Sequence, residues 1–179
     1  MRASGFAFLC VLLLAGACRT RVAGYPRDYY AGMSFTAIPG VGLAAEGGKV
    51  VRRTDRYDLA LEGQIVRHFW DDTDFADDDL GDPGRMTAVR FGARQALSPG
   101  SKRHATFRYG FQFYRATGQP GIVDDPGDYY GFYASAGFET ELSRHWSMGP
   151  EISVAVLEGE GSLPTEVVPT FFWRFVFWP

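Results

Sequence analysis

The feature that most constrains this chain is the alternation of aromatic and polar side chains, residue by residue, along several segments. In segment 106–114 every second position is aromatic, and the intervening positions are polar or small, as shown by Phe107, Tyr109, Phe111 and Phe113. Because successive side chains of a β-strand point to opposite faces, this period of two predicts strands with one aromatic and one polar face. The pattern recurs in 130–142 and 167–177, so we predict an all-β protein.

The spacing of the alternating segments predicts eight strands. They are 29–37, one strand within 41–51, 57–70, 86–97, 106–114, 130–142, 147–157 and 167–177. The second is the least distinct, and we include it because bacterial outer-membrane barrels have an even number of strands. From the third strand onward, long acidic connections alternate with short basic ones. This alternation is typical of an antiparallel up-and-down β-barrel in the outer membrane, with both termini on the periplasmic side.

Two prolines, Pro150 and Pro169, fall inside predicted strands. Proline lacks the N–H that a strand ladder uses, so it is usually confined to edges, strand ends and bulges. We therefore expect both prolines at strand ends or bulges, or strand boundaries that differ from those above.

The polar faces carry charges of both signs. An eight-stranded barrel has an interior just wide enough for side chains to fill, and buried charges are tolerated only when paired. We therefore predict a barrel sealed by an internal ion network, not a pore, formed by Asp58, Glu62, Arg90, Arg94, Arg108, Glu139, Glu141, Glu151 and Arg174. The alternative is a periplasmic, lipocalin-like lipoprotein with the faces reversed, whose ligand cavity would be lined by Phe107, Phe111 and Trp173.

The N-terminal region has the parts of a secretory signal peptide: Arg2, an apolar run over 6–14, and small residues before Cys18. We expect a signal peptide over 1–17, a periplasmic segment over 18–27 and the barrel over 28–179. The small residues at 15 and 17 suit ordinary cleavage, and the sequence Leu-Ala-Gly-Ala-Cys also resembles a lipobox, which makes Cys18 a candidate for lipidation. Only one cysteine follows this leader, so an intrachain disulfide is excluded.

Composition excludes several function classes. The formal net charge is −3 and the Lys and Arg residues are scattered, so we expect no nucleic-acid partner. The acidic run over 71–82 lacks the ordered spacing of a calcium loop, and we interpret it as a solvated loop rather than a Ca²⁺ site. No cofactor or metal motif is present, His68 and His104 stand alone, and the glycines at 47, 48 and 110 are interpreted as turn or barrel-closure positions.

A resemblance to a known family follows from two stretches. Segment 136–151 combines a glycine-bearing strand, a polar turn, Trp146 and then Glu151 on the next strand, and it resembles a hairpin of small outer-membrane barrels of the OmpX and OmpA type. Segment 171–178 resembles their aromatic final strand, although that family usually ends on Phe and here Trp178 and Pro179 follow Phe177. The resemblance implies an outer-membrane location, lipid and the barrel-assembly machinery as partners, and a monomer.

The layout around 61–70 is also similar to lipid A deacylases of the PagL type. Those enzymes carry His-x-Ser-Asn on a late strand, followed by an acidic residue, and use Ser as nucleophile, His as base and the carboxylate to orient the His. Here His145 and Ser147 have that spacing, Met148 replaces the Asn, and Glu151 is the nearest acid. We therefore hold a deacylase-like hydrolase using His145, Ser147 and Glu151 as the alternative to a non-enzymatic barrel with a structural or surface-interaction role.

Overall fold

The computed structural model describes residues 28–38, 41–69, 85–99, 101–117 and 126–179. The expected signal peptide 1–17, Cys18, the segment 18–27 and the acidic run 71–82 lie outside the described residues. Within the described part, no helix has the length and hydropathy needed to cross a membrane.

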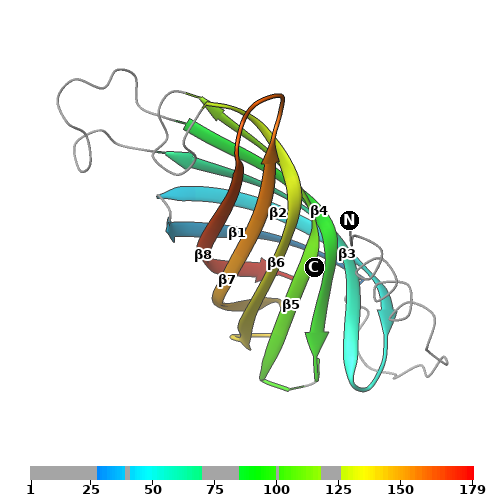
Figure 1. Cartoon of the computed structure of the whole chain (residues 1–179). Coiled ribbons are helices and arrows are strands. Elements are labelled where there is room, and N and C mark those ends of the chain that lie inside the picture. Colours follow the sequence, from blue (N-terminus) through cyan, green and yellow to red (C-terminus); the bar gives the residue numbers. More distant parts are fainter. Residues whose placement is uncertain (1–27, 39–40, 70–84, 100, 118–125) are drawn as a thin grey trace.

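Eight antiparallel strands follow one another around a single closed barrel (Figure 1), which confirms the predicted fold class. Each strand pairs with its neighbours in the sequence, and β1 also pairs with β8 to close the ring. The strands are β1 Tyr29–Ile38, β2 Gly42–Arg53, β3 Tyr57–Phe69, β4 Arg85–Leu97, β5 Arg103–Thr117, β6 Gly127–Glu141, β7 Trp146–Gly159 and β8 Thr165–Phe177.

The least distinct of the predicted strands, within 41–51, is present as β2 and pairs along most of its length with β1 and β3. The interpretation of the glycines at 47 and 48 as a turn is wrong, because both lie inside β2. The strand carries the inward sequence Gly42, Ala44, Glu46 and Gly48, and the small residues Gly42, Ala44 and Gly48 obscure the alternation of a half-buried strand.

Both prolines lie inside their strands, not at the strand ends or bulges that we expected. The pairing of β6 with β7 stops after Gly137 opposite Glu151 and resumes at Thr140 opposite Met148, and Pro150 lies in this interruption. Pro169 pairs with Val154 of β7, but it lies in the part of β8 beyond the pairing with β1, which extends only to Phe171. In each case the missing N–H falls where the ladder is already incomplete on one side, which removes most of its cost.

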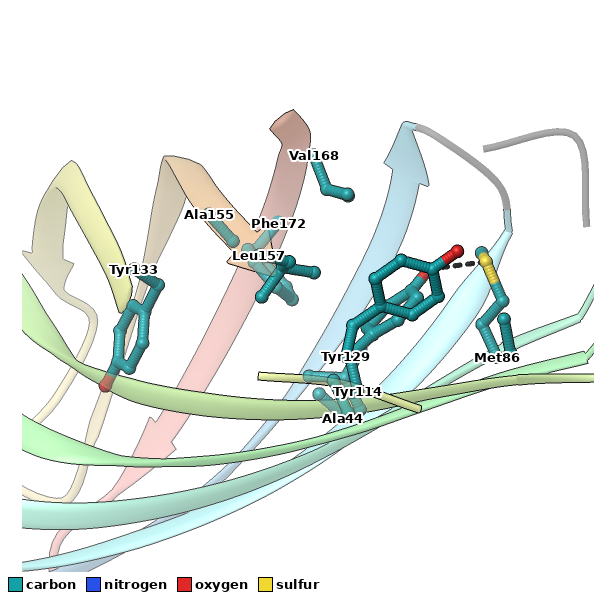
Figure 2. Close-up of a cluster of buried hydrophobic side chains, with 12 residues drawn as sticks. Ala44, Met86, Tyr114, Tyr129, Tyr133, Ala155, Leu157, Val168 and Phe172 are labelled. Atoms are coloured by element: carbon teal, nitrogen blue, oxygen red, sulfur yellow. Dashed lines mark hydrogen bonds between the residues drawn. The ribbon is translucent and has the colours of Figure 1, made fainter. Parts of the chain in front are cut away.

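The two ends of the barrel differ in their connections. The connections 54–56, 98–102 and 142–145 share one end, which we call the turn end, and we call the opposite end, with the connections 39–41, 70–84, 118–126 and 160–164, the loop end. The interior contains three layers between them. The apolar layer, nearest the loop end, comprises Ala44, Val66, Met86, Ala88, Tyr114, Ala116, Tyr129, Tyr133, Ala155, Leu157, Val168 and Phe172. Figure 2 shows side chains of this layer projecting from several strands, with the Tyr114 hydroxyl hydrogen-bonded to the Met86 sulfur.

The middle of the barrel holds what we call the ionic layer, four arginines and four glutamates that are each less than a tenth exposed: Arg90, Arg94, Arg108, Arg174, Glu46, Glu62, Glu139 and Glu151. A smaller apolar cluster closes the turn end, formed by Tyr30, Val50, Ala60, Val176 and Trp178.

Two inward glycines make room for the long side chains of the ionic layer. Gly92 of β4 lies directly opposite Gly110 of β5, and a Cβ on either residue would overlap the backbone of the facing strand. A Cβ on Gly92 would also lie 2.8 Å from the Tyr133 hydroxyl oxygen. The interpretation of Gly110 as a barrel-closure position is consistent with this close approach.

Candidate functional site: the luminal ion network

The ionic layer forms because side chains alternate between the inner and outer faces of each strand. On each strand the outward positions alternate with the inward charges, as in β5, where Arg108 is 1% exposed while the preceding Phe107 is 41% exposed. Because the barrel is closed, the inward faces of all strands converge on one narrow lumen. Residues far apart in the sequence therefore become ion-pair partners.

Arg108 is one of two arginines that each contact three carboxylates. Its Nη1 donates to Glu151 Oε1 at 3.1 Å, its Nε donates to Glu62, and its Nη2 lies 3.2 Å from Glu46 Oε2. Glu62 also accepts a hydrogen bond from the Tyr30 hydroxyl, which connects β1 to the network. One guanidinium thus joins carboxylates from β2, β3 and β7.

Arg174 of β8 joins a second, overlapping set. Its Nε donates to Glu46 Oε1 at 3.0 Å, and its Nη1 donates to Glu139 Oε1 and to Glu151 Oε2, both at 3.1 Å. Glu46 and Glu151 therefore each bridge Arg108 and Arg174. Sharing carboxylates in this way makes the arrangement a network instead of a set of separate pairs.

The network continues toward the turn end through Glu139. Its Oε1 accepts a hydrogen bond from Arg94 Nη2 at 2.6 Å, and its Oε2 accepts one from the Ser147 hydroxyl at 3.0 Å. His104 Nε2 lies 3.6 Å from the same carboxylate. With Glu139 and Arg94 included, every one of the eight strands contributes at least one side chain to the network.

Arg90 is held differently from the other three arginines. Its Nε donates to Gln112 Oε1 at 2.6 Å, and Gln64, which lies within 3.5 Å of Arg90 Nη1, donates in turn to Glu46. The guanidinium also lies 4.9 Å from the Tyr133 ring centre and 5.0 Å from that of Phe172. Arg90 is thus the contact between the ionic layer and the apolar layer.

Of the nine residues predicted to form the network, seven lie in the ionic layer and two do not. Glu62, Arg90, Arg94, Arg108, Glu139, Glu151 and Arg174 lie together in the ionic layer. Asp58 lies nearer the turn end, partly buried, with its Oδ1 3.3 Å from Arg53 Nε, and Glu141 is half-buried at the last position of β6. Sequence reasoning missed Glu46, although its place two residues after Ala44 in an alternating segment was a usable signal.

The candidate triad is not assembled. Ser147 points into the lumen and donates to Glu139, whereas His145 is exposed in the turn between β6 and β7, where its Nδ1 lies 2.8 Å from the carbonyl oxygen of Trp178. Glu151 is occupied by Arg108 and Arg174. The base and the nucleophile therefore face different environments, and the carboxylate orients neither of them.

The other histidines are also engaged, since His68 Nδ1 lies 3.2 Å from the Thr36 hydroxyl and His104 adjoins Glu139. Among the residues that the structure describes, no group of three or more His, Cys, Asp or Glu side chains could hold a metal ion. Chemically, the lumen provides fixed, mutually neutralising charges, which suit structural rigidity.

Trp178 is a further luminal residue that sequence reasoning missed. After β8 the chain turns inward, so that Trp178 is 6% exposed, its ring centre lies 5.1 Å from that of Tyr30, and its Nε1 lies 3.5 Å from the Ser147 hydroxyl. Its backbone N–H donates to the carbonyl of His145 at 2.8 Å. Trp178 therefore fills the turn end, and Phe177 is the last outward-facing residue of β8.

Comparison with known proteins identifies the fold. The chain matches no protein-family model and no curated protein sequence. Among solved structures, it is similar to Neisserial surface protein A, with a TM-score of 0.54 and 10% identity over 84% of this chain and 93% of that chain. It is also similar to the N-terminal β-barrel domain of Pseudomonas aeruginosa OprF, with a TM-score of 0.51 and 15% identity over 84% and 96% of the two chains. The chain thus has the fold of small eight-stranded outer-membrane barrels.

Proposed function

We propose that this protein is an integral outer-membrane barrel that acts without enzymatic chemistry, as a rigid, sealed scaffold that presents its loop end at the cell surface. The observation that carries the proposal is the distribution of side chains between the two faces of the barrel wall. Lipid is then its principal partner, the barrel-assembly machinery its partner during biogenesis, and a monomer its working state.

The outer face of the barrel wall exposes more large apolar side chains than the surface of a water-soluble protein normally does. Twenty-four large hydrophobic residues of the described chain are at least 36% exposed. Some of them cluster, since the rings of Phe111 and Phe132 lie 4.6 Å apart on adjacent strands. Contiguous exposed apolar surface of this extent marks contact with a membrane or a partner, and a band around a closed barrel fits a bilayer.

The faces contradict the lipocalin-like alternative. That reading requires aromatic side chains in the lumen, but Phe107, Phe111 and Trp173 are 41%, 63% and 39% exposed on the outside. Arg94 and Glu139, which it would place in water, are each 1% exposed in the interior. In water, a barrel with these faces would expose its apolar side chains and bury its charged side chains.

The lumen supports a sealed scaffold over a pore. The three interior layers fill the barrel along its length, and the four luminal arginines balance the four luminal glutamates. A network in which each charge has partners has no open path for ions and resists local rearrangement. The predicted triad adds no support for hydrolysis, since its members do not meet.

Two measurements on the full chain, produced in a Gram-negative host, test the proposal. We expect the protein in the outer-membrane fraction and a faster gel migration before boiling than after, because a closed barrel with paired backbone resists detergent until heated. In a planar bilayer the folded protein should give no steady conductance. Recovery in the soluble periplasmic fraction, or regular conductance steps, would overturn it.

Lipid A mass spectrometry tests the non-enzymatic part. We expect the same lipid A masses with the wild-type protein, with Ser147→Ala and with an empty vector. A shortened lipid A that appears with the wild type and disappears with Ser147→Ala would establish the deacylase alternative instead.

A further inference from the structure

Charge is distributed asymmetrically between the two ends of the barrel. Outside the ionic layer, the turn end carries seven Lys or Arg against four Asp or Glu, at positions 28, 49–58, 98–99, 101–103 and 141–145. At the loop end the described residues include Arg67, Arg85 and Arg115 against the acidic Asp128, Glu158, Glu160 and Glu166. The positive charge outside the ionic layer therefore gathers at the turn end.

Three of the turn-end cations lie on two adjacent connections. Arg103 begins β5 opposite Thr140 of β6, and the carbonyl of Lys102 accepts a hydrogen bond from the Glu141 N–H at 2.8 Å. This contact brings the turn between β4 and β5 beside the turn between β6 and β7, which carries Arg144. We call Lys102, Arg103 and Arg144, all of them exposed, the basic turn patch.

The basic turn patch borders the apolar outer face directly. Leu142 and Trp146, which flank the second turn, are 56% and 48% exposed, and the Leu142 N–H donates to the Trp146 carbonyl at 2.9 Å. The indole of Trp146 packs at 4.9 Å from the ring centre of Phe177. Exposed Trp beside cationic side chains is typical of the level at which a membrane-protein surface passes from acyl chains to headgroups.

We propose that the basic turn patch binds the phosphate of an anionic glycerophospholipid, such as phosphatidylglycerol, in the leaflet that surrounds the turn end. The inference rests on the proposed membrane location. The long stems of Lys102, Arg103 and Arg144 extend the apolar surface while their charged ends reach the headgroup level. Only Glu141, half-buried and inward-facing, opposes these three cations among the described residues of the two turns.

Trp146 supplies a local optical reporter for this binding. We would reconstitute the protein in phosphatidylcholine vesicles whose brominated acyl chains quench tryptophan, and then add unbrominated phosphatidylglycerol or unbrominated phosphatidylcholine. Trp146→Phe identifies the part of the signal that comes from the patch. We expect phosphatidylglycerol to relieve the Trp146 quenching several-fold more effectively than phosphatidylcholine, and this preference to fall as salt screens the charges.

Two matched triple variants separate the patch from net charge. Lys102→Gln, Arg103→Gln and Arg144→Gln together should lower the preference for phosphatidylglycerol by about fivefold for each cation removed, because a cation near an anionic surface contributes about that factor. Arg67→Gln, Arg85→Gln and Arg115→Gln together make the same charge change at the loop end and should leave the preference unchanged. Equal losses in both triples, or no preference in the wild type, would overturn the proposal.

Folding is checked separately. A charge-conserving triple variant serves as the control and combines Lys102→Arg, Arg103→Lys and Arg144→Lys. It should keep the preference for phosphatidylglycerol even if the glutamine triple folds poorly. If the charge-conserving variant folds but loses this preference, the proposal is overturned. Heat-modifiable migration in every vesicle preparation reports insertion. A wild type that never inserts contradicts the membrane function itself, whereas a wild type that inserts without lipid preference contradicts only the basic turn patch.

Discussion

The ionic layer and the apolar layer fill the same lumen by opposite means. In the apolar layer, side chains such as Leu157 and Phe172 are completely buried and are held by non-directional packing. In the ionic layer, Arg108 contacts carboxylates from three strands, and two of those carboxylates also bind Arg174. Packing can relax around a lost methyl group, but a buried charge cannot relax around a lost partner.

This difference indicates which of the two layers fixes the strand register of the closed barrel. Apolar side chains of similar size can exchange neighbours at small cost, so the apolar layer tolerates small errors in register. Together with Tyr30 of β1, the ionic layer connects all eight strands through directional contacts, and a register slip of one residue would turn every luminal charge of that strand to the outer face. We therefore expect the ionic layer to fix the register and the apolar layer to add stability.

The largest effect is expected from removing one of the two arginines of the ionic layer that each contact three carboxylates. Arg108→Leu leaves Glu46, Glu62 and Glu151 with less positive charge around them, and we expect it to lower the free energy of unfolding by about 4 kcal/mol, the range for uncompensated buried charges. Urea unfolding in phosphatidylcholine vesicles, followed by heat-modifiable migration, measures it. A loss below 1 kcal/mol, about the scale of a surface pair, would show that the network is not structural.

A smaller effect is expected from a cavity in the apolar layer. Leu157→Ala should lower the free energy of unfolding by about 3 kcal/mol, because it removes packing from a fully buried site. The control is Val156→Ala, one residue away on β7, whose side chain is 51% exposed on the outer face. If the two substitutions cost the same in the same urea titration, the interior at this level is not tightly packed.

The next effect in size is the energetic coupling between two ion-pair partners of the ionic layer, Arg94 and Glu139. In a double-mutant cycle of Arg94→Met and Glu139→Gln, we expect the double variant to be about 2 kcal/mol less destabilised than the sum of the single variants, since neither partner is left with an uncompensated charge. Calorimetric or urea-derived unfolding energies of the four proteins give the coupling. Simple additivity would mean that Glu139 depends on Arg174 and not on Arg94.

The smallest effect is expected outside the lumen. Arg115 and Asp128 form a two-pronged ion pair at 2.6 and 2.7 Å at the loop end, but Arg115 is largely exposed. Because exposed pairs are screened by water and salt, Arg115→Gln should leave the urea midpoint unchanged. It removes the same charge from the same strand as Arg108→Leu, so a comparable loss would break the distinction between luminal and surface charge.

The sequence by itself determined which residues face outward and which face the lumen. That assignment depends only on local backbone geometry, because side chains of a strand alternate between faces wherever the strand pairs. It was therefore possible to predict the eight strands and seven of the eight charges in the ionic layer from one chain. The exception, Glu46, lies among glycines and alanines whose small side chains weaken the alternation.

Only the tertiary structure decided which charge binds which. Arg94 and Arg108 lie directly opposite each other in the register, an unfavourable juxtaposition of like charges, yet one extends to Glu139 and the other to Glu62 and Glu151. Arg174 and Glu46 meet across 128 positions of sequence because closure brings β8 and β2 to the two flanks of β1. The inward turn of Trp178 and the sites that accept Pro150 and Pro169 likewise depend on where neighbouring strands end, and no local pattern contains that information.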